Sequence, residues 1–314
     1  MYTDLINSLR VQAHENFLIH VAKLTKLGDA HRIDDLVNSF VLCFGDLPPF
    51  SGYKHVPASA REIHSQVQAR FGAQNAREFL YACILQSVRN SLISGSFAHL
   101  PERIKGHQLK QFRRIIEQAS PITAICELDN DLFQKEMGLA LTRLYAAAAQ
   151  LVDFRTGIGR SMLTRSGVRG LPGRLSVFAK LGGFKPLFEI HTHLSYLDEF
   201  NEEGWNECYR CCADLYAVHP KVLGMQGGSW FYDPALADIS PRLGYLRDVP
   251  QQGGAWLLFT SSGEQSVHDA TSTSPTRKKL YDEGKYQPKN YTLIWSRATQ
   301  LNWAKTVDLN TKSV

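Results

Sequence analysis

The spacing of the apolar residues changes midway along the chain, and the change coincides with a segment of unusual charge. Residues 154–185 carry seven lysines and arginines, several glycines and no acidic residue. Before this segment apolar residues recur at the spacing of helices, whereas after it short apolar runs alternate with helical patterns. The sequence therefore predicts an all-α region over residues 1–153, a basic glycine-rich connector over 154–185, and an α/β domain over 186–314.

Six segments in the first half have helical periodicity, at residues 1–27, 30–44, 59–71, 75–94, 107–119 and 129–152. The last of these has the strongest pattern, because two aspartates begin it and a run of four alanines lies near its end. Alanine is the strongest helix former, and its small side chain allows close helix packing. We therefore expect a continuous helix from Asp129 to Val152.

The second half predicts strands and helices in alternation. The expected strands cover residues 186–194, 221–232, 255–261 and 291–296. The expected helices cover 201–218, 234–247 (as one helix or two short ones) and 274–283. Residues 301–307 fit either a strand or a helix. This order favours a mixed sheet covered by helices.

The formal net charge of +5 is concentrated in the connector. Residues 1–153 are close to neutral at about +1, and residues 186–314 carry a net charge of −3. A surface that coats nucleic acid is not indicated, because the excess is local and few aromatic residues lie among the arginines. A local anion site that includes Arg165 and Arg169, or a contact between the two halves, fits the pattern better. A non-catalytic module that binds anions or nucleic acid stays open as an alternative.

The six cysteines and the N-terminal residues indicate a reducing compartment. The first ten residues do not combine a basic stretch with an apolar one, and no run of 18 apolar residues occurs. We therefore expect a cytoplasmic protein without a membrane span. The Cys208-x-x-Cys211-Cys212 pattern lies in an amphipathic segment, which favours core packing over a zinc or redox site.

A Glu-x-His-x-His pattern ends the first expected strand of the second half. Side chains alternate between the faces of a strand, so Glu189, His191 and His193 are expected on one face. Carboxylate and imidazole groups in this arrangement can bind zinc or iron, and each can also accept a proton as a general base. The simpler interpretation is a pair of strand histidines hydrogen-bonded within a cleft or an interface.

Two adjacent glycines interrupt the next expected strand. Gly227 and Gly228 would expose backbone groups, and Ser229 adds a hydroxyl directly before the expected helix over 234–247. A glycine-rich strand that leads into a helix can hold an anion, so these three residues are candidates for cofactor binding. A structural turn is an equal competitor.

The C-terminal pattern resembles the GNAT acyltransferases. Leu280-Tyr281, followed by Gly284-x-Tyr286 and a strand, is similar to the ending of that family, and the order of strands and helices over 186–314 is similar as well. The resemblance implies a GNAT-like fold, an acyl-CoA or other acyl thioester as co-substrate, and Tyr281 as the acid that protonates the departing thiolate. The family's pyrophosphate-binding signature does not occur after the 221–232 segment.

These observations lead to one expected function. The chain would move an acyl group from a thioester to an amine or hydroxyl of a small metabolite. The thioester would lie in a cleft between the strands over 221–232 and 255–261. Glu189, His191 or His193 would serve as the base, and the connector would receive phosphates of coenzyme A. A metal-dependent enzyme that uses the His191/His193 pair is the alternative.

Overall fold

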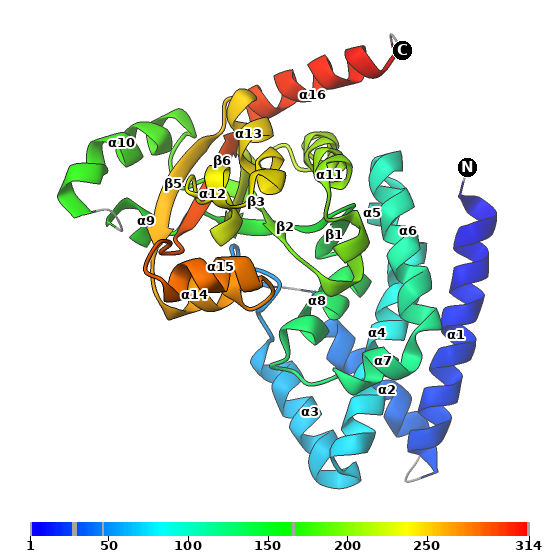
Figure 1. Ribbon diagram of the computed structural model, residues 1–314. Helices are drawn as coiled ribbons and strands as arrows, with labels where there is room; N and C mark the ends of the chain where they lie inside the picture. Colours follow the sequence, from blue (N-terminus) through cyan, green and yellow to red (C-terminus); the bar gives the residue numbers. More distant parts are fainter. Residues whose placement is uncertain (1, 27–29, 46, 165–166, 313–314) are drawn as a thin grey trace. The chain divides into compact units, whose positions relative to one another are not determined.

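The computed structural model describes residues 2–26, 30–45, 47–164 and 167–312, and Figure 1 shows its ribbon. The chain divides into two compact units, Met1–Ala147 and Ala148–Val314. The basic segment over residues 154–185 therefore belongs to the second unit.

The first unit consists mainly of helices, as its periodicity predicts. A long helix, α4, is buried around most of its circumference, with twelve buried residues, and it packs against α1, α2, α3 and α8. A helix that is apolar on all sides requires neighbours on all sides, which explains its central place in this unit. The helices are α1 (Thr3–Thr25), α2 (Ala30–Leu42), α3 (Ala58–Phe71), α4 (Ala73–Ile93), α5 (Gly95–Ala98), α6 (Glu102–Glu117), α7 (Ala119–Ala124) and α8 (Asp131–Ala140).

The expected helix from Asp129 to Val152 is wrong in its second half. Helix α8 ends at Ala140, and the alanine-rich stretch forms strand β1 (Leu144–Ala147) and the start of strand β2 (Gln150–Gly157). Thr142 and Ala148 have positive φ angles of 52° and 51°, so the backbone turns at each of them. All four residues of β1 are buried, and burial in a sheet outweighs the helical preference of alanine.

The residues of the basic segment, for which the sequence predicts neither helix nor strand, form regular structure. After β2 come the helices α9 (Ser161–Thr164) and α10 (Gly167–Lys180). An apolar cluster joins these helices to the sheet and contains Ile158, Met162, Val177, Phe178, Leu181, Leu187 and Ile294. Apolar side chains at helical spacing are present in this stretch, but the glycines and arginines between them make the helical pattern hard to recognise in the sequence.

The remaining elements follow the predicted alternation. They are β3 (Pro186–His191), η1 (Leu194–Glu199), α11 (Glu202–Leu215), β4 (Gly224–Ser229), η2 (Trp230–Tyr232), α12 (Leu236–Ile239), η3 (Pro241–Leu243), α13 (Tyr245–Gln252), β5 (Trp256–Ser261), α14 (Glu264–Thr271), α15 (Pro275–Asp282), β6 (Asn290–Ser296) and α16 (Arg297–Lys312). Residues 301–307 are thus helical.

The sheet is mixed, and its strand order is β1-β2-β3-β4-β6-β5. Strands β3 and β4 are parallel, whereas β2 with β3, β4 with β6, and β5 with β6 are antiparallel. Because β6 lies between β4 and β5, the expected cleft between the 221–232 and 255–261 strands does not exist. The last strand of the chain inserts there, and residue order along the chain does not reveal such an insertion.

Each face of the sheet has its own helical cover. On one face Phe188 stacks on Tyr216 at the end of α11, with ring centroids 5.0 Å apart, and Met225 accepts a hydrogen bond from Gln300 of α16. On the other face Leu187 and Ile294 share an apolar cluster with Val177 and Phe178 of α10. Within the described residues, no helix combines the length and the apolar character needed to cross a membrane.

Candidate functional site

The two parallel strands part before they end. Backbone pairing between them begins with the Leu223 N–H donating to the Pro186 carbonyl, and its register runs through Phe188↔Met225 to Glu189↔Gln226. Beyond that point each strand pairs only with its outer neighbour. Strand β3 stays paired with β2 as far as His191, and β4 stays paired with β6 as far as Ser229. The sheet therefore splits into two halves at the carboxyl ends of β3 and β4, and we call this opening the strand gap.

A row of polar side chains crosses one face of the sheet at the start of the strand gap. Glu189 is in register with Asp153 on one side and with Gln226 on the other, so these three side chains share a face. Leu187 lies two residues before Glu189 and therefore shares the face that α9 and α10 cover. Asp153 and Gln226 are buried, whereas Glu189 is half-buried.

The next row on the same face contains His191, Gly228 and Thr292. His191 lies two residues beyond Glu189, and Gly228 is in register with Thr292. The Thr292 hydroxyl is 2.7 Å from that of Thr260 on β5. This face therefore changes from apolar beneath α10 to polar at the strand gap, and a half-buried carboxylate and imidazole lie side by side along β3.

A β-bulge supports the first polar row. The register between β2 and β3 shifts between Asp153 and Thr156, and the Arg155 N–H donates to the Asp153 carboxylate at 2.8 Å. The Gln226 side-chain amide donates to the carbonyl of Gly157 at 3.3 Å. Bulges commonly redirect side chains beside functional sites, and this one fixes Asp153 opposite Glu189.

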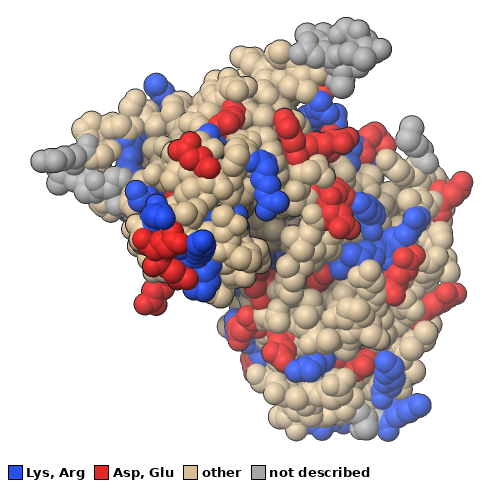
Figure 2. Space-filling model, viewed as in Figure 1, with Lys and Arg blue, Asp and Glu red and all other residues tan. Residues whose placement is uncertain are grey.

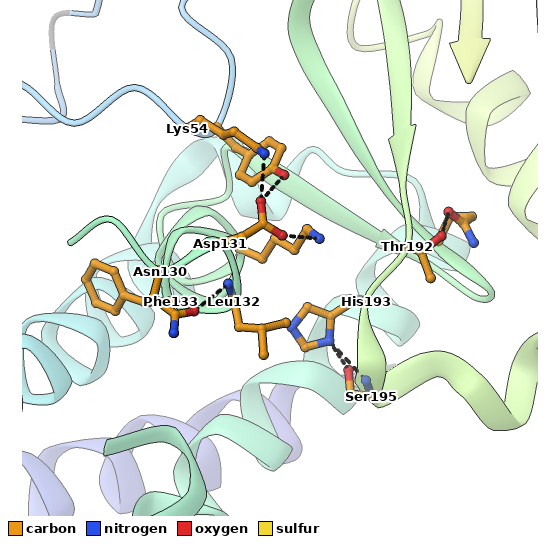
Figure 3. Close-up of polar contacts among 11 residues, drawn as sticks. Lys54, Asn130, Asp131, Leu132, Phe133, Thr192, His193 and Ser195 are labelled. Atoms are coloured by element: carbon orange, nitrogen blue, oxygen red, sulfur yellow. Dashed lines mark hydrogen bonds and ion pairs between the residues drawn. The ribbon is translucent and has the colours of Figure 1, made fainter. Parts of the chain in front are cut away.

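His193 lies beyond the strand and has a structural task. Its Nδ1 caps η1 by accepting the Ser195 backbone N–H at 3.1 Å, and it lies 2.7 Å from the Ser195 hydroxyl (Figure 3). Because the backbone N–H donates to Nδ1, the proton of the neutral ring is on Nε2. His193 is 4% exposed, so it is less accessible than His191.

The three predicted metal ligands do not converge as the sequence pattern suggests. Glu189 and His191 share a face, but the chain leaves the strand after His191 and turns into η1. Among the described residues, ligand atoms of Glu189, His191 and His193 do not all lie within 4.8 Å of one another.

The two glycines of β4 differ in what surrounds them. A Cβ atom at Gly227 would lie 2.7 Å from the Ile190 side chain and 3.2 Å from the Tyr232 hydroxyl, so Gly227 makes room for neighbouring side chains. A Cβ atom at Gly228 would meet only the Thr292 hydroxyl, at 3.7 Å, and Gly228 is exposed. Ser229 caps η2 by accepting the N–H of Phe231 at 3.4 Å.

Tyr281 lies in the last turn of α15 and is half-buried. Its hydroxyl makes no hydrogen bond within the described part of the chain. The nearby Gly284 has a φ angle of 67°, and Tyr286 is buried. Burial raises the pKa of Tyr286, the charge of Asp233 raises it further, and the charge of Arg277 opposes both effects.

Two candidate anion ligands of the basic segment, Arg165 and the side chain of Arg169, lie outside the described residues. Arg174 of the same segment is buried and donates to the carbonyls of Met162 and Phe259, so it attaches α10 to β5. On the face drawn in Figure 2, basic and acidic side chains are interspersed.

The cysteine pattern on α11 belongs to the core, as expected. Cys208, Cys211 and Cys212 are all buried, and burial raises the pKa of the Cys208 thiol well above its usual value. His219 is also a packing residue. It stacks on Phe154 with ring centroids 4.3 Å apart, and burial lowers its pKa to about 4.

The sequence interpretation missed two groups of residues. Asp153 and Gln226 lie in the polar row, but they come from strands that are distant in the sequence, so only the sheet register identifies them. Arg277 is a buried cation, and the Lys-Lys that follows it makes the site look like a solvated helix.

No family model matches the chain, and no curated protein matches it. Solved structures that are similar include an acyltransferase in complex with decanoyl-CoA. It has 13% sequence identity and a TM-score of 0.48, and the match covers 84% of this chain and 76% of that one. Another is an acyltransferase in complex with CoA and 10C-teicoplanin, at 11% identity, a TM-score of 0.49 and the same coverage.

Proposed function

We propose that the second unit transfers an acyl group from an acyl thioester, such as acyl-CoA, to an amine or hydroxyl of a small molecule. The observation that carries the proposal is the strand gap. Where two paired strands part, their facing backbone groups can bind an extended ligand that carries amides. The pantetheine arm of coenzyme A is such a ligand, because it is linear and contains two amide groups. The GNAT-like ending described above agrees with this donor.

The polar face beside the strand gap supplies the acid–base chemistry. A base on β3 removes a proton from the acceptor, and the acceptor's nitrogen or oxygen attacks the thioester carbonyl carbon. The tetrahedral intermediate collapses, the carbon–sulfur bond breaks, and the thiolate takes up a proton. The products are the acylated acceptor and free coenzyme A, so atoms and charges balance. Each such proton transfer contributes about 10²–10⁴-fold to the rate.

Glu189 and His191 are the two proposed bases. They share a face at the mouth of the strand gap and are both half-buried, whereas His193 is buried and holds η1 in place. Tyr281 is the proposed acid, because a phenol can protonate a departing thiolate. Gly228 and Ser229 would contact the donor along β4, and Gly227 would act indirectly by admitting Ile190.

The donor half of the proposal is tested by calorimetric titration of the whole protein with acetyl-CoA and decanoyl-CoA. We expect binding of at least one of them, and we expect Gly228→Val to weaken it at least tenfold, because its branched side chain would stand at the strand gap. The control is Ser272→Val, because Ser272 is exposed and lies at the end of α14 rather than on β4. Absence of binding by both donors would overturn the proposal.

The base is identified by release of free thiol in single-turnover assays. We expect Glu189→Gln or His191→Gln to lower the rate about 10²-fold or more, with donor affinity retained. His268→Gln, an exposed histidine on α14, is the matched control and should leave the rate unchanged. If neither β3 variant slows thiol release, the polar face does not provide the base.

A further inference from the structure

A buried arginine occupies the region that follows β4. Arg277 of α15 is only 4% exposed, and its guanidinium lies over the ring of Trp230, 4.4 Å from the centroid. Its Nε–H donates to the Ala270 carbonyl at 2.5 Å near the end of α14. One terminal nitrogen donates to the Ser240 hydroxyl at a long 3.4 Å. The guanidinium is therefore held in one orientation by three elements.

Arg277 has no acidic partner within the described residues. A buried cation without a counter-charge is costly, and most buried charges in proteins are paired. Asp233 is also buried in this region, but its two carboxylate oxygens accept the backbone N–H groups of Ala235 and Lys289. The carboxylate of Asp233 therefore bonds the backbone, and among the described residues it forms no ion pair with Arg277.

A second arginine adds to the positive charge. Arg242 lies in η3, two residues after Ser240, and it too forms no ion pair with a described residue. Burial lowers the pKa of Arg277, Tyr286 raises it, and the charge of Arg242 lowers it. A buried guanidinium bonded to the Ser240 hydroxyl, with a second cation on the η3 turn that follows Ser240, is an arrangement that an anion would stabilise.

We propose that Arg277, Arg242 and Ser240 form a binding site for an oxyanion, the phosphate or carboxylate group of a small molecule. A guanidinium fixed in orientation offers parallel N–H groups that match the oxygens of these anions, and the Ser240 hydroxyl adds a further donor. The stacking on Trp230 shields one side of Arg277 and strengthens the charge interaction. The site stands on these contacts, and it holds whether or not the second unit transfers acyl groups.

The position of the site gives it a functional meaning. Trp230 directly follows Ser229, the last residue of β4, so the anion would lie just beyond the strand gap. A ligand anchored there by its phosphate or carboxylate would be held beside the end of β4. The proposal therefore assigns an anionic group to a small molecule that this unit binds.

The test measures anion binding by the whole protein, with inorganic phosphate and succinate as separate probes. Ionic strength is held constant with sodium chloride, and binding is followed by calorimetry and by the thermal midpoint. We expect at least one anion to bind saturably and to raise Tm, because a ligand that binds only the folded state stabilises it. Arg277→Gln should abolish the effect, and Arg242→Gln should weaken affinity about tenfold.

The matched control is Arg247→Gln, which removes an arginine that already pairs with Asp248 at 2.7 Å. This variant should bind both anions as the wild type does. Arg242 is exposed, so Arg242→Gln decides the matter if Arg277→Gln fails to fold. Binding of neither anion by the wild type, or wild-type affinity in Arg242→Gln, overturns the proposal. Phosphate binding without succinate binding assigns the site to phosphorylated ligands, and the reverse assigns it to carboxylates.

Discussion

Buried charges in the two units differ in whether an ion pair satisfies them. In the first unit Glu136 is almost completely buried and pairs with Arg114 at 2.5 Å, and Glu78 accepts from both His20 and Lys23. In the second unit Arg277 is equally buried and has no acidic partner among the described residues. Charges that are satisfied internally hold a structure together, whereas an uncompensated charge is available to a ligand. The difference marks Arg277, rather than the paired acids Glu136 and Glu78, as a charge available to a ligand.

The largest predicted effect is a loss of stability when the buried ion pair of the first unit is broken. Glu136→Ala leaves Arg114 without its partner, and breaking a buried ion pair in this way costs about 3–5 kcal/mol. Urea unfolding followed by far-ultraviolet circular dichroism measures the loss. The control is Glu102→Gln, which breaks an exposed pair with Lys105 and should leave the unfolding midpoint unchanged. Equal midpoints for the two variants would show that the buried pair stabilises the protein no more than the exposed one.

A smaller loss of stability is expected from substitutions along β4, whose first residues are paired on both sides and whose last residues border the strand gap. A Cβ atom at Gly224 would lie 2.4 Å from the Trp295 carbonyl oxygen, so Gly224→Ala should destabilise the protein by about 1–3 kcal/mol. Gly228→Ala is the matched variant and should cost less than about 1 kcal/mol, because its methyl group meets only Thr292 at ordinary contact distance. Thermal unfolding compares the two. Similar losses would mean that β4 is equally enclosed at both ends.

The smallest effect concerns the pH dependence of the first unit. Burial raises the pKa of Asp131, but hydrogen bonds from Lys135, Tyr53 and Lys54 outweigh burial and hold this pKa well below its usual value (Figure 3). A carboxyl whose pKa is lower in the folded state stabilises the protein above its unfolded pKa of about 4. That contribution is lost as the pH falls below 4.

The corresponding variant is Asp131→Asn. The wild type should be more stable than this variant at pH 7, and the difference should shrink as the pH falls through 4 towards 3. Urea midpoints at several pH values measure it. A difference that stays constant with pH would show that the carboxylate charge of Asp131 contributes nothing.

The sequence predicts the fold where local pattern and tertiary environment agree. Strand β3 and helix α11 occur within a few residues of their expected positions, because alternation and amphipathic spacing both reflect burial on one face. Prediction fails at Leu144–Ala147, where buried alanines form a strand. It also fails over α10, where an apolar face lies among glycines and arginines. In both places contacts with the sheet decide the outcome, and such contacts are not local in the sequence.

The candidate site divides in the same way. Glu189 and His191 follow from alternation along one strand, and the structure places them on one face. The strand gap, Asp153 and Gln226 depend on the register between strands, which a single sequence does not specify. The sequence does not single out Arg277, because its burial and its lack of an acidic partner among the described residues are properties of the folded chain.

The position of the tryptophans gives the division into units an optical consequence. All five lie after residue 200, and therefore all five belong to the second unit. Emission excited at wavelengths selective for indole reports on that unit alone, whereas helical dichroism reports on both units, since each contains helices. Comparing the two signals in a single unlabelled sample therefore shows whether the units unfold together. Trp230, stacked against Arg277, is an indole placed directly at the proposed anion site.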